Sequence, residues 1–243
     1  MNAPRRVALE RAFLLHHRPW SDTSRILDLM TRSHGRVTLF ARGARRPGSG
    51  LRALLQPFVP LLVSWTGPAD GGTLTGAEPD GVPAGLPAPQ LMSGFYLNEL
   101  LLQLLPREDC HERLFDAYAT ALARLAAEPG SRALRAFELV LLEELGYGLE
   151  LAREAGGGEP LDPDRYYHFR PGLGALAVRD AAGDAEAMPG RDLLAVSRGE
   201  LERPAALAAA RRILRGAISH CLEGRGLRSR DVMLAMRRRE HDA

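Results

Sequence analysis

The sequence predicts an α+β protein in which a small β-barrel or sandwich precedes a helical domain. Three observations support this prediction: five short strand-like runs within the first eighty residues, a proline- and glycine-rich stretch at 79–90, and helical spacing of the apolar residues beyond it. Because the strands come first and the helices afterwards, the order excludes a repeated βαβ arrangement. We therefore expect two domains, 1–80 and 81–243, separated within the proline-rich stretch.

The N-terminal strands show the apolar runs and the alternation that are typical of a sheet with one buried face. Ser33–Gly35 is a short turn whose glycine can adopt a positive φ angle, so it predicts a hairpin. In the strand after this turn the odd-numbered residues, Val37 to Ala41, face one way, and the even-numbered ones, Arg36 to Arg42, face the other. The predicted strands are Val7–His17, Ser24–Thr31, Arg36–Gly43, Leu54–Trp65 and Gly72–Glu78.

Five helices are predicted in the second domain from apolar residues at helical spacing. Ser131 follows Pro129-Gly130 and is expected to be the N-cap of the third helix. The segment 153–190 is rich in Gly, Pro and Asp, which predicts an irregular insertion with a short strand pair at 166–169 and 175–178. The predicted helices are Leu91–Leu105, His111–Ala127, Ser131–Leu145, Pro204–Glu223 and Leu227–Arg239.

Composition narrows the class of protein further. With 243 residues, 45% of them hydrophobic and 26% charged, the chain can bury a real core, which excludes a fully disordered or collagen-like protein. Neither a run of about 18 apolar residues nor an apolar secretory segment is present, so we expect no membrane span and a cytoplasmic location. The two cysteines, Cys110 and Cys221, support no disulfide framework and no four-cysteine metal site.

Charge is distributed unevenly along the chain. Residues 1–65 hold eleven arginines against Glu10, Asp22 and Asp28, a net charge of +8, whereas the whole chain carries only +2. The remainder of the chain is therefore mildly acidic. A basic module of this kind usually contacts phosphate groups.

The sequence shows no signature of an enzyme. It lacks metalloprotease, P-loop, nucleophile-elbow and dinucleotide motifs. His16 and His17 are adjacent on a predicted strand and face opposite sides, so they cannot both ligate one metal ion. Glu138, Glu143 and Glu144, on the third predicted helix, are expected to form a solvated polar face. We therefore expect no catalytic site and no metal site.

The basic loop around Pro47–Gly50 is the strongest functional signal. Its arginines, Arg42, Arg45, Arg46 and Arg52, could neutralise phosphates, and the charge of the domain favours this over a merely solvated loop. Phe40 faces the same way as the two arginines of its strand, where an exposed ring could stack on a base. The alternative, that Phe40 fills the barrel interior, is favoured because small barrels need large side chains inside. The C-terminal arginines, 225, 228, 230 and 237–239, either contact DNA or offset a helix dipole.

Several segments, taken together and in order, resemble the RecO family of bacterial recombination mediators. No single motif is diagnostic, but the order of the segments matches the family from about residue 9 to about residue 235. The segments are Arg11-Ala-Phe-Leu-Leu-His16, Arg18-Pro-Trp-Ser-Asp-Thr-Ser24, Gly35-Arg-Val, Ala41-Arg-Gly-Ala-Arg45, Leu55-Gln-Pro-Phe-Val-Pro-Leu-Leu62, Tyr96-Leu-Asn-Glu-Leu100, Arg135-Ala-Phe-Glu-Leu139, Leu145-Gly-Tyr-Gly148 and Leu227-Arg-Ser-Arg230.

This resemblance implies an N-terminal OB-fold barrel, a helical domain and no enzymatic activity. Proteins of this family bind single- and double-stranded DNA and anneal complementary strands, including strands coated with single-strand binding protein (SSB). With the partner RecR they help RecA to displace SSB, and they dock the acidic C-terminal tail of SSB on the helical domain. The resemblance thus implies DNA, SSB and RecR as direct partners, RecA as an indirect one, and a place at the nucleoid.

Carried over by position, the resemblance implies two sets of contact residues. The family's Ala-Arg-Gly-Ala-Arg stretch makes Arg42 and Arg45 candidates for phosphate contact, and the whole predicted DNA-binding set is Arg18, Arg36, Arg42, Arg45, Arg46 and Arg52. Arg135 and Phe137 are candidates for holding the SSB tail, with the guanidinium taking the carboxylate and the apolar groove taking the ring. The alternative is that Arg135 is an exposed helix residue and Phe137 belongs to the core.

The sequence departs from some members of the family at one point, and two other functions remain as alternatives. Some family members bind zinc through four cysteines after the Leu-Gly-Tyr-Gly turn, but 153–190 contains none, so we expect a protein without metal or cofactor. The main alternative function is a protein-only adaptor whose arginines contact acidic partners such as the SSB tail. A further alternative is an RNA-binding OB protein, because phosphate neutralisation and stacking serve both nucleic acids.

Overall fold

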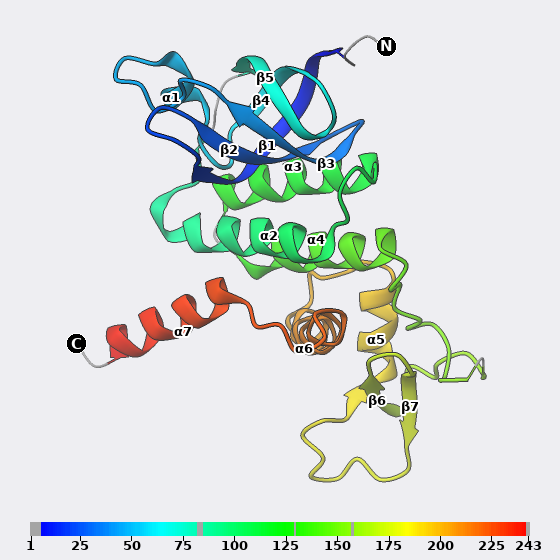
Figure 1. Cartoon of the computed structure of the whole chain (residues 1–243). Coiled ribbons are helices and arrows are strands. Elements are labelled where there is room, and N and C mark those ends of the chain that lie inside the picture. The colour runs from blue at the N-terminus through cyan, green and yellow to red at the C-terminus, as the bar shows by residue number, and fades with distance from the viewer. Residues whose placement is uncertain (1–5, 82–84, 129, 157, 242–243) are drawn as a thin grey trace. The chain divides into compact units, whose positions relative to one another are not determined.

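The computed structural model describes residues 6–81, 85–128, 130–156 and 158–241 (Figure 1). The chain forms two compact units. Unit 1 comprises residues 1–129 and 227–243, and unit 2 comprises residues 130–226. Strands dominate the beginning of the chain and helices the remainder, so the predicted α+β class, with its N-terminal barrel, is confirmed.

Five strands form a closed barrel in unit 1. They are β1 (Arg6–Pro19), β2 (Arg25–Thr31), β3 (Gly35–Ala41), β4 (Pro60–Thr66) and β5 (Asp70–Pro79). The order around the barrel is β1-β2-β3-β5-β4, with β4 pairing back to β1, and only the β3–β5 pair is parallel. This arrangement is that of an OB-type barrel. A short helix, α1 (Gly50–Leu54), lies between β3 and β4.

The long strand β1 closes the barrel because it pairs with two neighbours. Its register shifts between Leu14 and His16 along β2, and between Val7 and Glu10 along β4. Such bulges bend a strand and increase its twist, which allows one strand to serve both edges of the closing sheet.

The barrel interior is apolar and follows the predicted alternation. Val37, Leu39 and Ala41 are fully buried in one cluster with Leu14, Leu27 and Trp65. Phe40 does not belong to this cluster and lies half-buried on the outer face of β3. The expectation that Phe40 fills the interior is therefore wrong. Leucines and Trp65, contributed by all five strands, fill the small volume without it.

Helices α2 (Leu91–Leu104), α3 (Glu112–Ala127) and α7 (Arg228–His241) complete unit 1, with a 3-10 turn, η1 (Ala88–Gln90), before α2. The Phe13 ring of β1 packs on Phe115 and Tyr118 of α3, at centroid distances of 5.2 and 5.0 Å. Tyr118 donates to the Asn98 amide oxygen, and the Asn98 amide donates to the carbonyl of Leu15. The compact unit that holds the barrel is therefore larger than the segment 1–80.

Unit 2 contains α4 (Ser131–Glu144), α5 (Gly190–Ser197), α6 (Pro204–Cys221) and a three-stranded sheet. The sheet has the order β7-β6-β8 and consists of β6 (Tyr166–Arg170), β7 (Gly174–Val178) and β8 (Met188–Pro189). The strand pair predicted inside 153–190 is present as β6 and β7. Helix α5 was not predicted, because its eight residues are too few to show a clear apolar period.

The expected N-cap of the third predicted helix differs in the structure. Gly130 occupies the N-cap position of α4 and has no side chain to cap it, while Ser131 is already helical. The Ser131 hydroxyl instead accepts hydrogen bonds from Arg211 of α6, at 3.1 Å from Nε. Ser131 therefore joins two helices of unit 2 and does not cap its own.

Candidate nucleic-acid interface

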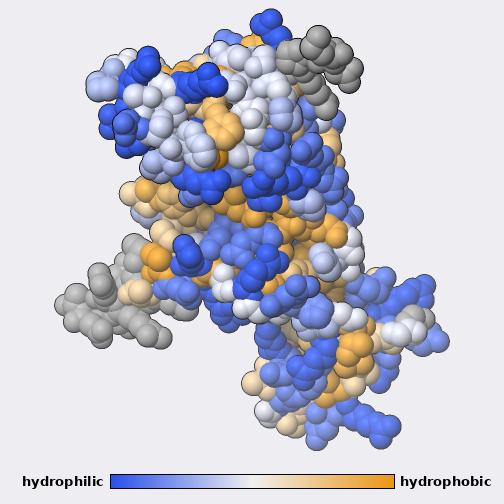
Figure 2. Space-filling model, viewed as in Figure 1, coloured by the Kyte–Doolittle hydropathy of each residue, from blue (hydrophilic) through white to orange (hydrophobic). Residues whose placement is uncertain are grey.

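The basic loop between β3 and β4 is anchored to the barrel at both ends. Ala44 and Leu55 are fully buried in the barrel core, and the chain between them turns tightly through hydrogen bonds from Arg46 to Gly43 and from Ser49 to Arg46. The arginine side chains therefore project from a fixed backbone. Figure 2 shows hydrophilic side chains gathered over this end of the barrel, near α1.

The strand register brings Arg18 to the same end of the barrel as the loop. Arg18 of β1 pairs with Ile26 of β2, and the neighbouring Arg25 pairs with Ala41, the last residue of β3 before Arg42. Arg18 and Arg42 therefore flank the start of β2 from its two sides. Five of the six predicted DNA-binding arginines are exposed at this end: Arg18, Arg42, Arg45, Arg46 and Arg52.

These arginines differ from three other arginines of unit 1, each of which pairs with a carboxylate. Arg11 pairs with Asp80, Arg32 with Glu112 and Asp116, and Arg107 with Asp70. Within the described part of the chain, no carboxylate pairs with the five exposed arginines. Their positive charge is not neutralised locally, so it is available to an anionic ligand. We call these five residues the arginine surface.

Arg45 also joins the basic loop to the turn between β1 and β2. Its backbone N–H donates to the carbonyl of Thr23 at 2.9 Å, and its Nη1 donates to the carbonyl of Ser21 at 2.8 Å. The turn is closed by a further bond from Trp20 N–H to the Ser24 carbonyl at 3.1 Å. The loop and the turn are thus held as one element at this end of the barrel.

Arg36, the sixth predicted DNA-binding residue, occupies a different environment. It is half-buried, and its Nη1 donates to the Leu102 carbonyl of α2 at 2.6 Å. Burial, reinforced by the charge of Arg107, lowers the pKa of its guanidinium. The side chain is engaged with the helix, so the prediction that Arg36 contacts phosphate gains no support from its position.

Two aromatic side chains lie beside the arginine surface. Trp20, in the turn after β1, is 63% exposed, and its ring meets that of Phe40 edge-on at a centroid distance of 5.3 Å. Sequence reasoning considered Phe40 but not Trp20. The available signal was the position of Trp20 in a polar turn next to Arg18, where a large ring has no strand or helix face to pack on.

The residues predicted to hold the SSB tail are both engaged inside unit 2. Phe137 is buried in the core, and the Arg135 guanidinium forms an ion pair with Glu138, whose side chain is fully buried. Glu138 therefore does not belong to a solvated polar face, and that expectation is wrong for it. An ionised carboxylate is costly to bury without a partner, and Arg135, one turn earlier on α4, supplies one.

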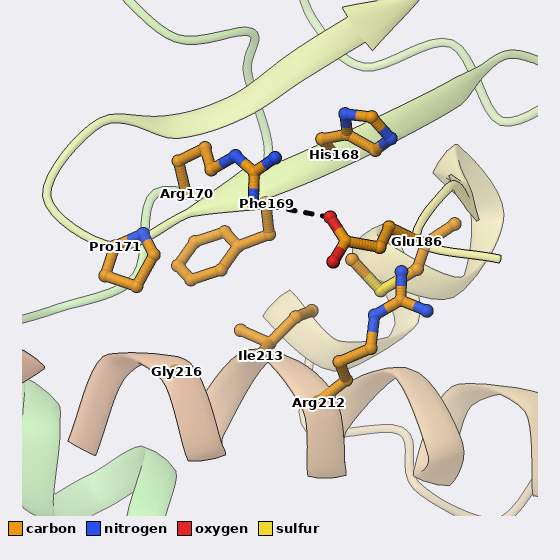
Figure 3. A pocket seen from close by; sticks show the side chains of 9 residues that line it. His168, Phe169, Arg170, Pro171, Glu186, Arg212, Ile213 and Gly216 are labelled. Atoms are coloured by element: carbon orange, nitrogen blue, oxygen red, sulfur yellow. Dashed lines mark ion pairs between the residues drawn. The ribbon is translucent and has the colours of Figure 1, made fainter. Parts of the chain in front are cut away.

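A small cleft opens in unit 2 between β6 and α6 (Figure 3). Phe169 and Ile213 point into it, and Arg170 forms an ion pair with Glu186 across it at 3.4 Å. Arg212 donates to the backbone carbonyl of Ala185 at 2.6 Å. The cleft combines an apolar floor with two arginines, and its lining contains no nucleophile paired with a base.

Neither a metal site nor a membrane span is found among the residues that the structure describes. No group of three or more His, Cys, Asp or Glu side chains comes together there as metal ligands would. No helix of that part of the chain is long and apolar enough to cross a bilayer. The side chains of Arg237–Arg239, part of the C-terminal arginine cluster, lie outside the described residues.

Comparison with known proteins finds matches over nearly the whole chain. Residues 6–80 match the family model for the recombination protein O N terminal, and residues 89–231 match that for its C terminal. The chain is 45% identical over 230 residues to the DNA repair protein RecO of Methylococcus capsulatus, covering 94% of each chain. It is 45% identical over 246 residues to that of Thiobacillus denitrificans, covering 96% of this chain and 94% of the relative.

Proposed function

The chain belongs to the RecO family of DNA repair proteins, and from this premise we propose that it is a non-enzymatic mediator of repair and recombination that binds and anneals DNA. The observation that carries the proposal is the arginine surface: five exposed guanidinium groups without carboxylate partners at one end of an OB-type barrel. In this fold oligonucleotides bind on the face of the second and third strands and at the loops after the first and fourth strands, and here the loop after the first strand is the turn that Arg45 holds.

Annealing follows from phosphate neutralisation and needs no nucleotide hydrolysis. Two DNA strands repel each other, and a surface that neutralises phosphates on both lowers this repulsion and raises their local concentration. The same surface serves single- and double-stranded DNA, because both present a phosphate backbone. A role at DNA would place the protein at the nucleoid.

The partners in this proposal are those that the family resemblance implies. The protein anneals strands coated with SSB and, together with RecR, helps RecA to replace SSB on single-stranded DNA. The docking of the SSB tail belongs to unit 2. Because Arg135 and Phe137 are engaged internally, the cleft of Figure 3 offers a more accessible receptor, lined by Arg170 and Phe169 from β6 and by Arg212 and Ile213 from α6. The Glu186 carboxylate, which is exposed, must leave Arg170 when an acidic tail binds.

A labelled SSB tail peptide distinguishes these two positions. The Arg170→Ala variant alters the cleft, and the Arg135→Met, Glu138→Met double variant removes both partners of the buried ion pair together. Weaker binding in the first variant locates the tail in the cleft, and weaker binding in the second locates it at α4. A wild-type protein that does not bind the peptide overturns tail docking altogether.

The main proposal is tested by fluorescence anisotropy of a labelled single-stranded oligonucleotide at several salt concentrations. The Arg42→Ala, Arg45→Ala, Arg46→Ala triple variant should bind more weakly and with a flatter salt dependence, by roughly 0.7 unit of slope per lost phosphate contact on a single strand. The matched control replaces three exposed arginines of unit 2, Arg179, Arg191 and Arg215, by alanine, with the same change in net charge. An equal loss in both variants contradicts a defined interface on the barrel.

Two further measurements separate the alternatives. If the wild-type protein does not bind DNA but binds an acidic peptide, the protein is an adaptor and not a DNA-binding mediator. Equal or tighter binding of an RNA oligonucleotide of the same length favours the RNA-binding alternative. Incubation of labelled DNA with added magnesium should leave it intact, and cleavage would contradict a non-enzymatic role.

A further inference from the structure

We propose that Trp20 and Phe40 form a stacking platform for unpaired bases, which makes the protein prefer single-stranded over duplex nucleic acid. The inference rests on the proposed function, because the arginine surface must first bring the phosphate backbone to this end of the barrel. It adds a second class of contact, to the bases, and this contact is made by Trp20 and Phe40, which do not belong to the arginine surface.

The two rings are joined and remain accessible. Trp20 is 63% exposed, and its ring lies at 5.3 Å and 64° from that of Phe40. Phe40 is half-buried on the outer face of β3, where a Cβ atom at Gly71, at the start of β5, would lie 3.9 Å from its ring. Phe40 thus packs against the barrel wall, and Trp20 packs against the Phe40 ring.

The backbone that carries Trp20 is held in place. Three hydrogen bonds fix the turn, one within it from Trp20 to Ser24 and two from Arg45 to Thr23 and Ser21. A ring on a fixed turn loses little conformational freedom when a base stacks on it, so more of the stacking energy contributes to affinity.

The surroundings of the pair match nucleic acid and not an apolar partner. Arg18 precedes Trp20 by two residues, Arg42 follows Phe40 by two, and neither has a carboxylate partner among the described residues. Each ring thus has an arginine two residues from it along the chain, while the turn after Trp20 adds one exposed carboxylate, Asp22. Aromatic rings with arginines around them are the combination that binds single strands, with phosphates on the cations and bases on the rings.

Duplex and single-stranded ligands should respond differently to this platform. In a duplex each base is already stacked on its neighbours and paired, so it has no free face for Trp20. In a single strand the bases can rotate onto the rings. The arginines therefore contribute to both ligands, while the rings contribute only to the unpaired one.

The chain provides its own optical probe for the test. It contains two tryptophans, of which Trp65 is 1% exposed in the barrel core and Trp20 is 63% exposed. A change in intrinsic fluorescence on addition of an oligonucleotide should therefore report on Trp20. The Trp20→Phe variant should lose this signal and keep most of its affinity, because a ring remains at the site.

The decisive experiment compares a single-stranded oligonucleotide with a hairpin duplex of the same number of phosphates. Trp20→Ala should weaken single-strand binding by about ten-fold or more and change duplex binding by less than about two-fold. Phe40→Leu, which keeps the apolar bulk, should have a smaller effect in the same direction. Tyr147→Ala, which removes an exposed ring of unit 2, is the matched control and should change neither.

The outcomes also separate this inference from the proposed function. If Trp20→Ala binds single strands as tightly as the wild type does, the proposed stacking platform is refuted, while the proposed DNA binding by the arginine surface is unaffected. If it loses single-strand and duplex binding equally, Trp20 acts by shaping the loop and the inference is likewise overturned. If the wild-type protein binds neither ligand, the proposed function and the platform fail together.

Discussion

Arg36 lies near the start of β3 and Arg42 directly after its end, yet the structure gives them different roles. Arg36 donates to a carbonyl of α2 and is half-buried, while Arg42 is exposed and has no carboxylate partner among the described residues. Arg135 differs from both, because it neutralises a buried carboxylate. At the scale of the residue, the partner of a guanidinium group decides whether it serves the fold or remains available to a ligand.

Truncation of Arg135 is expected to destabilise unit 2. The Arg135 side chain is 14% exposed and that of Glu138 is fully buried, so Arg135→Ala removes the guanidinium that forms an ion pair with a buried carboxylate, at a cost of about 3–5 kcal/mol. Chemical denaturation should detect this loss. The control is Arg198→Ala, which breaks an exposed pair with Glu200 and should change the free energy of unfolding by no more than about 1 kcal/mol. Equal effects of the two variants would contradict the structural role of Arg135.

At the scale of the element, the β2–β3 hairpin depends on a close approach between chain segments. Gly35, the first residue of β3, has a φ of 65°, and a Cβ atom on it would lie 2.1 Å from the carbonyl oxygen of Asp109. The turn therefore needs glycine for two reasons. One is the left-handed backbone, which the sequence indicated, and the other is the contact with the segment between α2 and α3, which it did not.

The Gly35→Ala substitution should separate these two reasons when it is compared with Gly48→Ala. Gly48 has a φ of 77°, but no neighbouring atom lies within 4 Å of the position that a Cβ atom would take, so alanine there costs only the backbone strain, about 1–2 kcal/mol. Gly35→Ala adds a clash with the backbone and should lose roughly 1–3 kcal/mol more. Thermal and chemical denaturation of both variants give the difference. Equal losses would show that the Asp109 contact relaxes freely.

Helix α7 is joined to α2 through a carboxylate. The Glu99 oxygens accept from the backbone N–H groups of Arg228 and Ser229, at 2.8 and 2.9 Å, and from the Ser229 hydroxyl. Burial opposes the ionisation of Glu99, but the hydrogen bonds from Ser229 and Arg228 outweigh it and lower the pKa of this carboxyl. Glu99 thus acts as an N-cap that comes from another helix.

The Glu99→Gln substitution should loosen the start of α7 in a pH-dependent way. Because the pKa of Glu99 is lower in the folded protein than in the unfolded chain, its stabilisation is present at neutral pH and is lost as the pH falls through the folded pKa. At pH 7 the variant should be less stable by about 1 kcal/mol, the usual value of a cap. Below the folded pKa it should match the wild type. Hydrogen exchange of the 228–229 amides and denaturation at both pH values measure this, and a difference that persists in acid contradicts it.

At the scale of the whole molecule, the net charge of +2 conceals a concentrated positive region at one end of the barrel. A protein with this distribution is attracted only weakly to acidic surfaces as a whole, but it attracts phosphates strongly at this one place. Its binding to DNA should therefore depend on a few direct contacts and on the release of the counterions that they displace.

The salt dependence of single-strand binding measures the number of these contacts. If all five residues of the arginine surface contact phosphates, the slope of log K against log salt should be roughly −3.5, which is about a hundred-fold loss of affinity between 50 and 200 mM salt. Annealing of complementary labelled strands should weaken in parallel and should be the same with and without ATP. A slope near zero, or a requirement for ATP, would contradict the proposed mechanism.

The sequence by itself predicted the elements whose signal is local. The barrel strands, the β6–β7 hairpin and the long helices follow from alternation and helical spacing, and the basic loop follows from composition. Two local features were not predicted correctly. Ser131 does not cap α4, which begins after Gly130, and α5 was missed because it is too short to show an apolar period. A cap depends on one or two residues, and a helix of eight residues spans only about two turns, so the apolar period of a segment gives little information on either.

The tertiary structure alone decided which side chains are free and which are engaged. Arg36 meets Leu102 across 66 residues, Asn98 meets Leu15 across 83, and Arg45 meets Ser21 across 24. Periodicity tells which face of a strand a residue occupies, but it carries no information on what covers that face. For this reason the basic loop could be located from the sequence. Only the fold shows that Trp20 packs on Phe40 beside this loop, that Arg36 is engaged with α2, and that Glu138 is buried against Arg135.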